Sequence, residues 1–447
     1  MSNALASAWE RTLRRRGADT AVVHAWDGAS FTFDELDRRA RSWLASHATQ
    51  ALPLAGRAVV FSTPNGIGWF EVFLGLLRAG AVMVPLDPGE PPAAQERIAA
   101  SVRAAFRWDG SRLLPLDGSR RLRGPACLVK LTSGSTGEPR PLVFTAEQLI
   151  ADGRQVTATM GIGVNDLNHA LIPLGHSYGL GNLTLPLITR GIPLVCGSSP
   201  LPSAVAEEIH RWRPTVFPSV PAVWRALAAA GVEPALLKSL RLAVSAGAPL
   251  PPEVARDFLA RFGLPLCNFY GSSETGGIAF DRGGGATLLG GVGRPLRSVQ
   301  VTALRGRRIR VCSPAVFTAG NRRRTGGQGC WSPGDLATLD ARGGLRLAGR
   351  RGAIVKVAGR RVSVAEVELS LRRLAGVREA CVQVSPGPEA ILGAAVATER
   401  PVAELRAELA LNTAPWKIPK KWAVVPGLPL NARGKVDARS VAARLFG

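Results

Sequence analysis

The sequence predicts an α/β protein: a large N-terminal domain of parallel-rich sheets covered by helices plus a β-rich subdomain, followed by a small C-terminal α+β domain. Three observations lead to this fold class. Apolar segments of helical period alternate with short apolar strands over the first 280 residues. Glycine-rich turns and short strands replace this alternation after residue 283. A strand–turn–strand pattern and an amphipathic helix then follow residue 345.

Helical and strand-like segments alternate in the first part of the chain. Residues 31–47 predict a helix that begins after Thr32, because their apolar residues fall on one helical face. Residues 57–63 and 81–87 predict buried strands on either side of a helix at 69–80, which is the βαβ order of a parallel sheet. The same order continues with a strand at 192–197, a helix at 204–212, a strand at 215–220, a helix at 221–231 and a strand at 240–250.

The last part of the chain has a different pattern. Residues 345–362 predict two strands joined by a turn, residues 363–376 predict an amphipathic helix, and residues 379–385 predict another strand. We therefore expect domains at 1–350 and 353–447 with a boundary near 349–352. The second part has 95 residues, enough for a small domain.

The chain is strongly basic. Lys and Arg number 56 against 33 Asp and Glu, which gives a net charge of +23. Arginine supplies 49 of the 56, and with 50 Gly and 33 Pro this composition is typical of high-GC bacterial coding bias. An anionic partner, such as nucleic acid, a membrane, a nucleotide or an acidic protein, is the alternative explanation.

Several classes of protein are excluded by simple patterns. No apolar run approaches the roughly 18 residues of a membrane span, and the first residues lack the apolar segment of a secretory signal. The six cysteines are scattered without a CxxC pair, so we expect no disulfide framework and a reducing, cytoplasmic environment. The five histidines lack metal-ligand spacing.

Residues 128–145 carry the strongest local signal for chemistry. An apolar strand runs into six consecutive Thr, Ser or Gly residues, which are Thr132, Ser133, Gly134, Ser135, Thr136 and Gly137. Glycines let backbone N–H groups approach a polyanion, hydroxyls add donors, and Arg140 adds charge, as a phosphate-binding loop requires. The spacing is not that of the P-loop NTPases. A flexible Ser/Gly loop is the alternative.

Three further segments carry isolated charged residues near strands or turns. In 267–280, Tyr270 is suited to stacking on a ring, and Glu274 beside hydroxyls is suited to Mg²⁺ with phosphate oxygens. Glu274 as a helix N-terminal acid is the alternative. Asp335 follows a Pro-Gly turn, where it either accepts two ribose hydroxyl protons or, more commonly, caps the turn. Lys435 is either a point charge for a carboxylate or phosphate, or an ordinary surface lysine.

In this order and spacing, the segments resemble the adenylate-forming superfamily of acyl-CoA synthetases, nonribosomal-peptide adenylation domains and firefly luciferase, from about residue 20 to 442. The matching segments are TSGSTGEPR (132–140) for the phosphate loop, PLGHSYGLGN (173–182) for the acyl-pocket gate, SAGAPL (245–250) for the adenine turn, YGSSE (270–274) for the aromatic-Gly-x-Thr-Glu motif, SPGDL (332–336) for ribose binding and GKVDAR (434–439) for the C-terminal lysine. The resemblance implies a large N-terminal domain and a small, rotating C-terminal lid.

The resemblance also implies an activity. A carboxylic acid attacks ATP to give an acyl-adenylate and pyrophosphate, and the acyl group then passes to a thiol of CoA or of an acyl carrier protein's phosphopantetheine. Because no carrier domain follows Gly447, we expect the acceptor to be supplied in trans. An acidic carrier protein would also suit the positive charge of the chain.

The resemblance assigns roles to residues. Catalysis is assigned to Lys435, Glu274, Ser273 and His176, with Glu274 as the Mg²⁺ ligand. ATP binding is assigned to the 132–137 loop with Arg140, Gly247, Ala248, Tyr270, Gly271, Asp335 and Arg350. The acid pocket is assigned to His176, Ser177, Tyr178, Val220, Trp224 and Ser272. Lys356 and Gly359 are expected near the thiol channel, and Gly352 at the hinge.

Three positions depart from the family pattern. Arg140 replaces the usual Lys, which keeps the charge but changes the donor geometry. Ser273 replaces Thr. Gly352 replaces the usual hinge Asp or Lys, and glycine should permit the rotation.

The class of acid is predicted by one segment. Amino-acid-activating relatives place an Asp early in the pocket segment, whereas residues 215–224 contain no acid. An aryl or other non-amino carboxylic acid is therefore favoured, with a fatty acid or an amino acid as alternatives.

Two rivals come from other classes of protein. A nucleic-acid-binding protein should gather its basic residues, yet 16 lie in 351–447 and 40 in 1–350, without a reader motif. A catalytically inactive scaffold is disfavoured by intact Lys435, Glu274 and Asp335.

Overall fold

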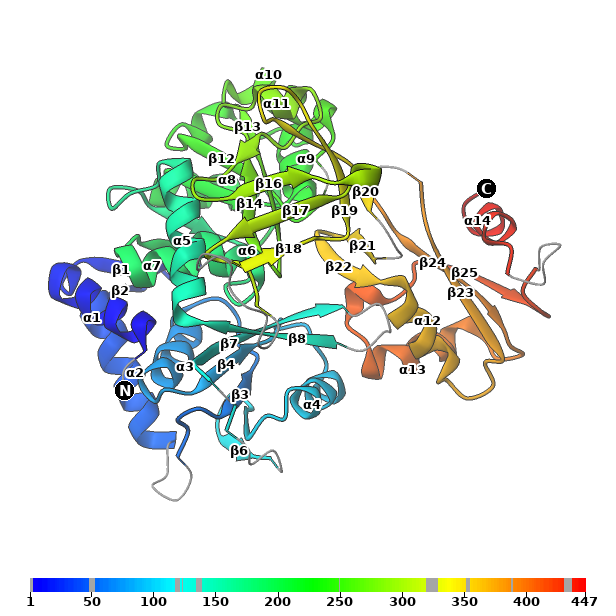
Figure 1. Cartoon of the computed structure of the whole chain (residues 1–447), viewed down its shortest axis with the longest axis horizontal. Coiled ribbons are helices and arrows are strands. Elements are labelled where there is room, and N and C mark those ends of the chain that lie inside the picture. Colours follow the sequence, from blue (N-terminus) through cyan, green and yellow to red (C-terminus); the bar gives the residue numbers. More distant parts are fainter. Residues whose placement is uncertain are drawn as a thin grey trace. The chain divides into compact units, whose positions relative to one another are not determined.

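The structure is a computed structural model that describes residues 3–47, 53–116, 121–122, 124–133, 139–248, 250–318, 329–350, 354–386, 389–429 and 436–447. It divides into two compact units. The N-terminal unit comprises residues 1–88, 102–130 and 141–349, and the C-terminal unit comprises 89–101, 131–140 and 350–447 (Figure 1). The C-terminal unit thus includes two short segments that the sequence assigns to the first domain. Gly352 lies outside the described residues, so the hinge stays a prediction.

A nine-stranded sheet organises the N-terminal unit. Its strands, in spatial order, are β15 (Arg294–Pro295), β14 (Gly276–Phe280), β13 (Leu266–Ser272), β12 (Leu242–Ser245), β11 (Val216–Ser219), β9 (Asn168–Ala170), β10 (Leu194–Cys196), β1 (Thr20–His24) and β2 (Ser30–Thr32). The six neighbours from β13 to β1 run parallel. Their carboxyl ends therefore share one edge of the sheet. The predicted α/β class with parallel-rich sheets is confirmed.

Both faces of this sheet are buried at its centre, which explains why strands such as β10, β11 and β12 are rich in apolar residues without alternation. On β11, Val216 belongs to the main core and Phe217 to a second core. The second core contains Trp224 and Phe258, from two of the helices that cover this face (Figure 1). These helices are α8 (Pro202–Trp212), α9 (Pro221–Ala229) and α10 (Pro252–Phe262). Each begins with proline, which suits a position where no intrahelical N–H bond is made.

A six-stranded sheet forms the second layer of the unit. Its order is β6 (Leu113–Pro115), β5 (Phe106–Trp108), β3 (Ala58–Phe61), β4 (Val82–Pro85), β7 (Ala126–Ser133) and β8 (Pro139–Thr145). The helices that the sequence predicts around it are α2 (Phe33–His47) and α3 (Ile67–Arg78). The predicted start of α2 is confirmed, because Glu35 N–H donates to Thr32 Oγ1 (3.1 Å) and Thr32 N–H donates to Glu35 Oε2 (2.8 Å). The unit also contains α1 (Ala4–Arg16), α5 (Ala146–Met160) and α7 (Leu185–Arg190).

Short strands follow the large sheet, as the glycine-rich sequence predicts. They are β16 (Gln300–Ala303), β17 (Ile309–Ser313), β18 (Gly329–Trp331), β19 (Asp335–Leu339) and β20 (Leu345–Arg350). Cys312 and Cys330 lie opposite each other on β17 and β18 and form a disulfide. The sequence predicted no disulfide framework and did not identify this single disulfide, because strand pairing brings together two cysteines whose spacing gives no signal. The other cysteines are buried, and burial raises the pKa of Cys127 and Cys196 to about 12.

The C-terminal unit is a small α+β fold. Its strands and helices from residue 354 are β21 (Ile354–Val357), β22 (Arg360–Ser363), α12 (Val364–Arg372), β23 (Glu379–Val384), β24 (Leu392–Ala397), α13 (Val402–Asn412), β25 (Lys421–Val425) and α14 (Ala438–Phe446). The helices α12 and α13 share one apolar cluster with β23 and β24, and α14 shares another with β24 and β25. The three-stranded sheet is therefore covered on both faces. Helix α4 (Pro92–Ser101) also belongs to this unit.

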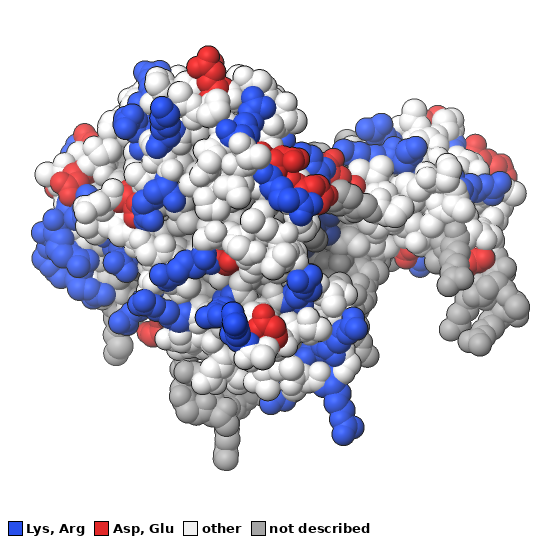
Figure 2. Space-filling view, turned by 90° about the horizontal axis from the view of Figure 1, so that it is seen from above, with Lys and Arg blue, Asp and Glu red and all other residues white. Residues whose placement is uncertain are grey.

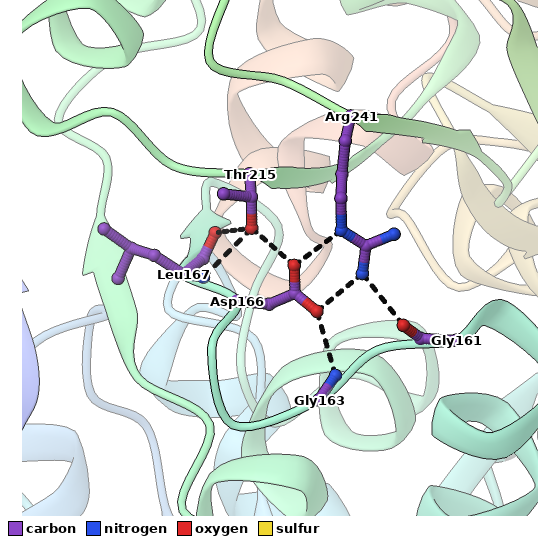
Figure 3. A network of polar contacts seen from close by, with 6 residues as sticks. All are labelled: Gly161, Gly163, Asp166, Leu167, Thr215 and Arg241. Carbon is purple, nitrogen blue, oxygen red and sulfur yellow. Dashed lines mark hydrogen bonds and ion pairs between the residues drawn. The ribbon is translucent and has the colours of Figure 1, made fainter.

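The amino ends of the parallel strands are joined by one polar network, centred on Asp166 (Figure 3). Arg241, which precedes β12, donates from Nε to Asp166 Oδ1 at 2.7 Å. Thr215, which precedes β11, donates its hydroxyl to the same oxygen at 2.7 Å, and Gly163 N–H donates to Oδ2 at 2.9 Å. Burial opposes ionisation of the carboxyl, but these donors outweigh it and hold the pKa of Asp166 below its usual range.

Asp166→Asn should lower the free energy of unfolding by about 2 kcal/mol at pH 7, because a buried carboxylate loses charge-assisted hydrogen bonds. A carboxylate with a lowered pKa stabilises the fold above its unfolded pKa, so the difference between wild type and variant should shrink as the pH falls below about 4. Urea unfolding at several pH values measures both effects. Asp257→Asn, at an exposed position on α10, is the matched control. Equal stability of wild type and D166N at pH 7 would contradict the role of the network.

Candidate active site

The carboxyl ends of four adjacent parallel strands lead into the predicted site residues. His176, Ser177 and Tyr178 follow β9, Val220 follows β11, Gly247 and Ala248 follow β12, and Ser273 and Glu274 follow β13. In parallel α/β sheets, ligands bind outside this edge, where loops from neighbouring strands meet. Segments separated by about a hundred residues in sequence thus converge at one edge.

Two predicted nucleoside contacts lie together. The hydroxyl of Tyr270, on β13, donates a hydrogen bond of 2.8 Å to Asp335 Oδ2, at the start of β19. Tyr270 is buried and Asp335 is partly buried. The bond fixes the Asp335 carboxylate beside an aromatic ring, as a site for a ribose next to a stacked base requires.

The predicted acid-pocket segment contacts the predicted phosphate-contacting segment. Ser177 Oγ donates to Ser273 Oγ at 3.1 Å. The neighbouring Ser272 hydroxyl pairs with the Thr275 hydroxyl at 3.0 Å, which closes the turn that carries Glu274. His176 is exposed at the start of the short helix α6 (Ser177–Gly179). The structure therefore places the acid-binding and α-phosphate-binding candidates side by side.

Tyr178 and Trp224 lie deeper than the other pocket candidates. The Tyr178 hydroxyl donates to the carbonyl oxygen of Val244 at 3.2 Å, and burial raises the pKa of this phenol well above its usual value. The Trp224 indole N–H donates to the same carbonyl at 3.3 Å, and its ring packs within the second core, fully enclosed. Val220 is partly buried at the start of α9. Direct contact of Trp224 with an acid stays a prediction.

Glu274 is held by its backbone and lies near a buried cation. Its carbonyl oxygen accepts a hydrogen bond of 2.7 Å from Phe317 N–H, and its carboxylate interacts electrostatically with Lys130. Over the parts of the chain that the structure describes, three or more His, Cys, Asp or Glu side chains never gather into a metal site. Mg²⁺ usually takes one or two carboxylates and completes its shell with water and phosphate oxygens, so a single partly buried carboxylate fits it.

Glycines keep the backbone of this site open. A Cβ on Gly271 would lie 2.7 Å from the Gly276 carbonyl oxygen, so the close approach of β13 and β14 requires glycine. Gly247 has a φ of 89°, the left-handed region that favours glycine. The next residue, Ala248, is partly buried in the same turn, which the resemblance assigns to adenine.

The remaining predicted residues are described in part. Thr132 is buried on β7, and Arg140 is exposed on β8. In the C-terminal unit, Lys356 is partly buried on β21, and Gly359 adopts a φ of 80° in the two-residue turn to β22. Six predicted site residues lie outside the described part of the chain: Gly134, Ser135, Thr136, Gly137, Gly352 and Lys435. For Ser133 and Arg350, only the backbone is described. The assigned roles of these residues stay predictions.

Sequence reasoning missed two polar side chains that support the site. Asn65 Nδ2 donates to the carbonyl oxygens of Ala170 and Ile172, and its Oδ1 accepts from Leu174 N–H at 3.0 Å. It thus fixes the chain that leads to His176. Lys130 is the other, and a lysine inside an otherwise apolar strand was a signal that the sequence offered.

The chain matches one family model. The model of the AMP-binding enzyme covers residues 9–108 and 123–307, more than half of the chain. The chain belongs to the family of AMP-binding enzymes. The predicted resemblance to the adenylate-forming superfamily is therefore confirmed.

Curated relatives and solved structures agree with this family. The AMP-binding enzyme is 29% identical to a feruloyl-CoA synthase of Amycolatopsis sp., over 93% of this chain and 94% of the relative. It is 27% identical to the benzoate–CoA ligase of Thauera aromatica, over 95% and 92%. Among solved structures, the amide bond synthetase McbA from Marinactinospora thermotolerans superimposes with a TM-score of 0.83 at 25% identity, over 98% of this chain and all of that one.

Tyr270→Phe and Asp335→Asn should each weaken ATP binding by about 10-fold, and the double variant should be weaker by less than the product of the two, because the two groups act as a pair. Equilibrium binding of ATP to the four proteins measures the coupling. Tyr178→Phe is the control for the loss of a buried phenol hydroxyl. In the wild type, the Tyr178 hydroxyl donates to a backbone carbonyl oxygen and not to Asp335. Strictly multiplicative losses would contradict a shared role.

Proposed function

We propose that this AMP-binding enzyme adenylates an aryl carboxylic acid with ATP and then transfers the acyl group to a thiol. The observation that carries the proposal is the convergence of nucleoside, phosphate and acid candidates at one sheet edge, with the Tyr270–Asp335 and Ser177–Ser273 contacts. Two curated relatives bear the names of ligases for aromatic acids, feruloyl-CoA synthase and benzoate–CoA ligase. An acid–thiol ligase of this kind acts on a small carboxylic acid.

The adenylation step requires positioning and charge neutralisation more than covalent catalysis. A carboxylate oxygen attacks the α-phosphorus of ATP, a bond to the β-phosphate oxygen breaks, and pyrophosphate leaves. We assign adenine to Tyr270, Gly247 and Ala248, and the ribose hydroxyls to Asp335 with Arg350. We assign the β- and γ-phosphates to the 132–137 loop with Arg140. When bound, Mg²⁺ would neutralise phosphate charge beside Glu274.

The acid would lie between the turn after β9 and the start of α9. If Ser273 contacts the α-phosphate as assigned, its contact with Ser177 would bring the acid segment next to the reacting phosphorus. Tyr178, Val220 and Ser272 would border the acid, and His176 would gate it. The apolar and aromatic character of this lining favours an aryl acid over an amino acid, whose ammonium group would need a carboxylate partner.

The acceptor in this proposal is the thiol of CoA or of an acyl carrier protein. Figure 2 shows Lys and Arg side chains scattered over the visible face with far fewer Asp and Glu, a positive surface that would suit a phosphorylated or acidic acceptor. Lys356 and Gly359 would border the path of the thiol. The likeness to an amide bond synthetase supports a second candidate for the second step, transfer of the acyl group to an amine.

We propose the cytoplasm as the location of the reaction. Among the described residues, every helix is too short or too polar to cross a membrane.

Carboxylate-dependent exchange of pyrophosphate into ATP tests the proposal. A panel of benzoates, cinnamates, fatty acids and amino acids is supplied one at a time, and we expect exchange with aryl acids. Exchange with fatty or amino acids alone would replace the aryl assignment, and no exchange with any acid would refute adenylation. The best acid is then offered CoA, a phosphopantetheinylated carrier protein or an amine.

The salt dependence of the second step distinguishes the acceptors. If an acidic carrier protein is the acceptor, its loading should slow several-fold between about 50 and 300 mM NaCl, because charge steering is screened. CoA at saturating concentration is the control for salt effects on the chemistry. Loading of the carrier that does not depend on salt would leave the charge of +23 without this role.

A further inference from the structure

Lys130 and Asp152 form a buried ion pair that the adenylation chemistry does not use directly. Lys130 lies on β7 and Asp152 on α5, and their side chains are only 3% and 4% exposed. The Lys130 Nζ atom is 3.7 Å from Asp152 Oδ2 and lies 4.6 Å from the centre of the Phe144 ring. A buried ion pair contributes little net stability on average, because desolvation opposes attraction. A role in fixing local geometry is therefore the more informative hypothesis.

Asp152 reaches the segment that follows Glu274. Its Oδ1 accepts a hydrogen bond of 3.0 Å from Gly277 N–H, at the beginning of β14. A Cβ on Gly276 would lie 2.3 Å from the same oxygen, and Gly276 has a φ of 69°. The backbone after Glu274 is thus shaped to receive this carboxylate, and no larger residue would fit there.

Lys130 reaches the same segment through its charge and its ring contact. Burial lowers the pKa of the Lys130 ammonium, while the negative charges of Asp152 and Glu274 act in the opposite direction. The Phe144 ring under the ammonium packs against Phe317 at 5.9 Å, and Phe317 N–H holds the Glu274 carbonyl oxygen at 2.7 Å. Gln148, also on α5, donates to the neighbouring Val316 carbonyl oxygen at 2.8 Å.

Together, these contacts connect the turn that carries Glu274 to the elements packed around it. One side is β7, which carries Lys130 two residues before Thr132 of the expected phosphate segment. The other sides are α5, the start of β14 and the Phe317 segment. We propose that Lys130 and Asp152 are positioning residues, which hold the Glu274 turn in the geometry that binds MgATP.

The proposal rests on the adenylation function and makes a selective prediction. The double variant Lys130→Met with Asp152→Asn removes one positive and one negative charge, so the net charge near Glu274 does not change. Any change in MgATP binding would then come from a changed position of the Glu274 turn. Removing residues that hold a metal ligand in place usually weakens metal binding by about 10- to 100-fold. The acid-lining candidates lie on other elements: the Tyr178 hydroxyl donates to the carbonyl oxygen of Val244, and Val220 caps the start of α9.

Titration calorimetry with MgATP and no acid is the first measurement. We expect the folded double variant to bind MgATP at least about 10-fold more weakly than wild type. In pyrophosphate exchange, the KM for MgATP should rise correspondingly, while the KM for the acid should change by less than about twofold. Asp166→Asn is the control, because it removes a buried charged contact at the opposite edge of the sheet and should leave both constants unchanged.

Three results would overturn the proposal. The first is an unchanged MgATP affinity in the folded double variant, and the second is an equal rise in the KM of both substrates. If the double variant does not fold, Asp152→Asn alone decides by the same measurements. The third result is that neither variant folds, which would make the pair a requirement of the fold and not a positioning device for Glu274. A wild-type protein that binds MgATP but adenylates no acid would refute the proposed function while the positioning role remained measurable.

Discussion

Lys435→Ala should reduce carboxylate-dependent pyrophosphate exchange by about 100- to 1,000-fold. The family resemblance gives Lys435 a bridge between the acid carboxylate and the α-phosphate while negative charge gathers in the transition state. A contact made mainly in the transition state lowers kcat when it is lost and leaves ground-state binding almost intact. The KM for MgATP should therefore change little.

The second half-reaction provides a sharper form of this test. When the acyl-adenylate is prepared chemically and supplied with the thiol, the Lys435→Ala variant should form the thioester at nearly the wild-type rate, because Lys435 is assigned only to the first step. Lys420→Ala, at an exposed position just before β25, is the matched control and should retain both steps. Wild-type exchange in the Lys435→Ala variant would remove the residue from the mechanism.

Glu274→Gln should lower kcat/KM for MgATP by about 100-fold and raise the Mg²⁺ concentration that gives half-maximal exchange. Glutamine retains the size of the side chain and loses the anionic oxygen that a hard cation prefers. The backbone contact with Phe317 does not depend on the side chain, so the turn should keep its shape. Exchange measured across a range of free Mg²⁺ at saturating ATP separates metal binding from nucleotide binding.

Glu253→Gln, in the exposed first turn of α10, controls for the loss of one carboxylate elsewhere on the same unit. Its Mg²⁺ dependence should match that of wild type. If the Glu274→Gln variant also matches wild type, then Glu274 acts only as a structural acid in its turn. The alternative from the sequence, a helix N-terminal acid, does not apply, because Glu274 lies in a turn between β13 and β14.

The sequence predicted the elements near the site well, because local signals decide them. The helix after Thr32 has its own capping box, and strands of the large sheet such as 192–197 and 240–245 are too apolar to lie on the surface. Contacts between distant segments could not be predicted in the same way. The bonds between Tyr270 and Asp335, and between Ser177 and Ser273, span 65 and 96 residues. Only the order of the strands in the sheet brings those residues together.

Long-range pairing also explains the disulfide, which the sequence did not predict. The disulfide between Cys312 and Cys330 depends on the register of β17 and β18, which residue spacing does not encode. The ring of Trp224 packs in the second core, so the structure gives its position but leaves its contact with an acid a prediction. The phosphate segment and Lys435 were identified by motif alone, and the Lys435→Ala variant above tests the chemistry of the lysine.

Helix α4 has a consequence for engineering by domain exchange. It is encoded between β4 and β5, yet it packs in the C-terminal unit, where Lys417 Nζ lies 2.8 Å from Glu366 and 3.7 Å from Glu90. Arg97 likewise donates to the side chain of Asn412 at 3.3 Å. A chimaera that exchanges only the residues after 349 would therefore replace one half of these contacts and keep the other. Grafts that carry segment 89–101 together with the C-terminal residues should retain both halves of the interface.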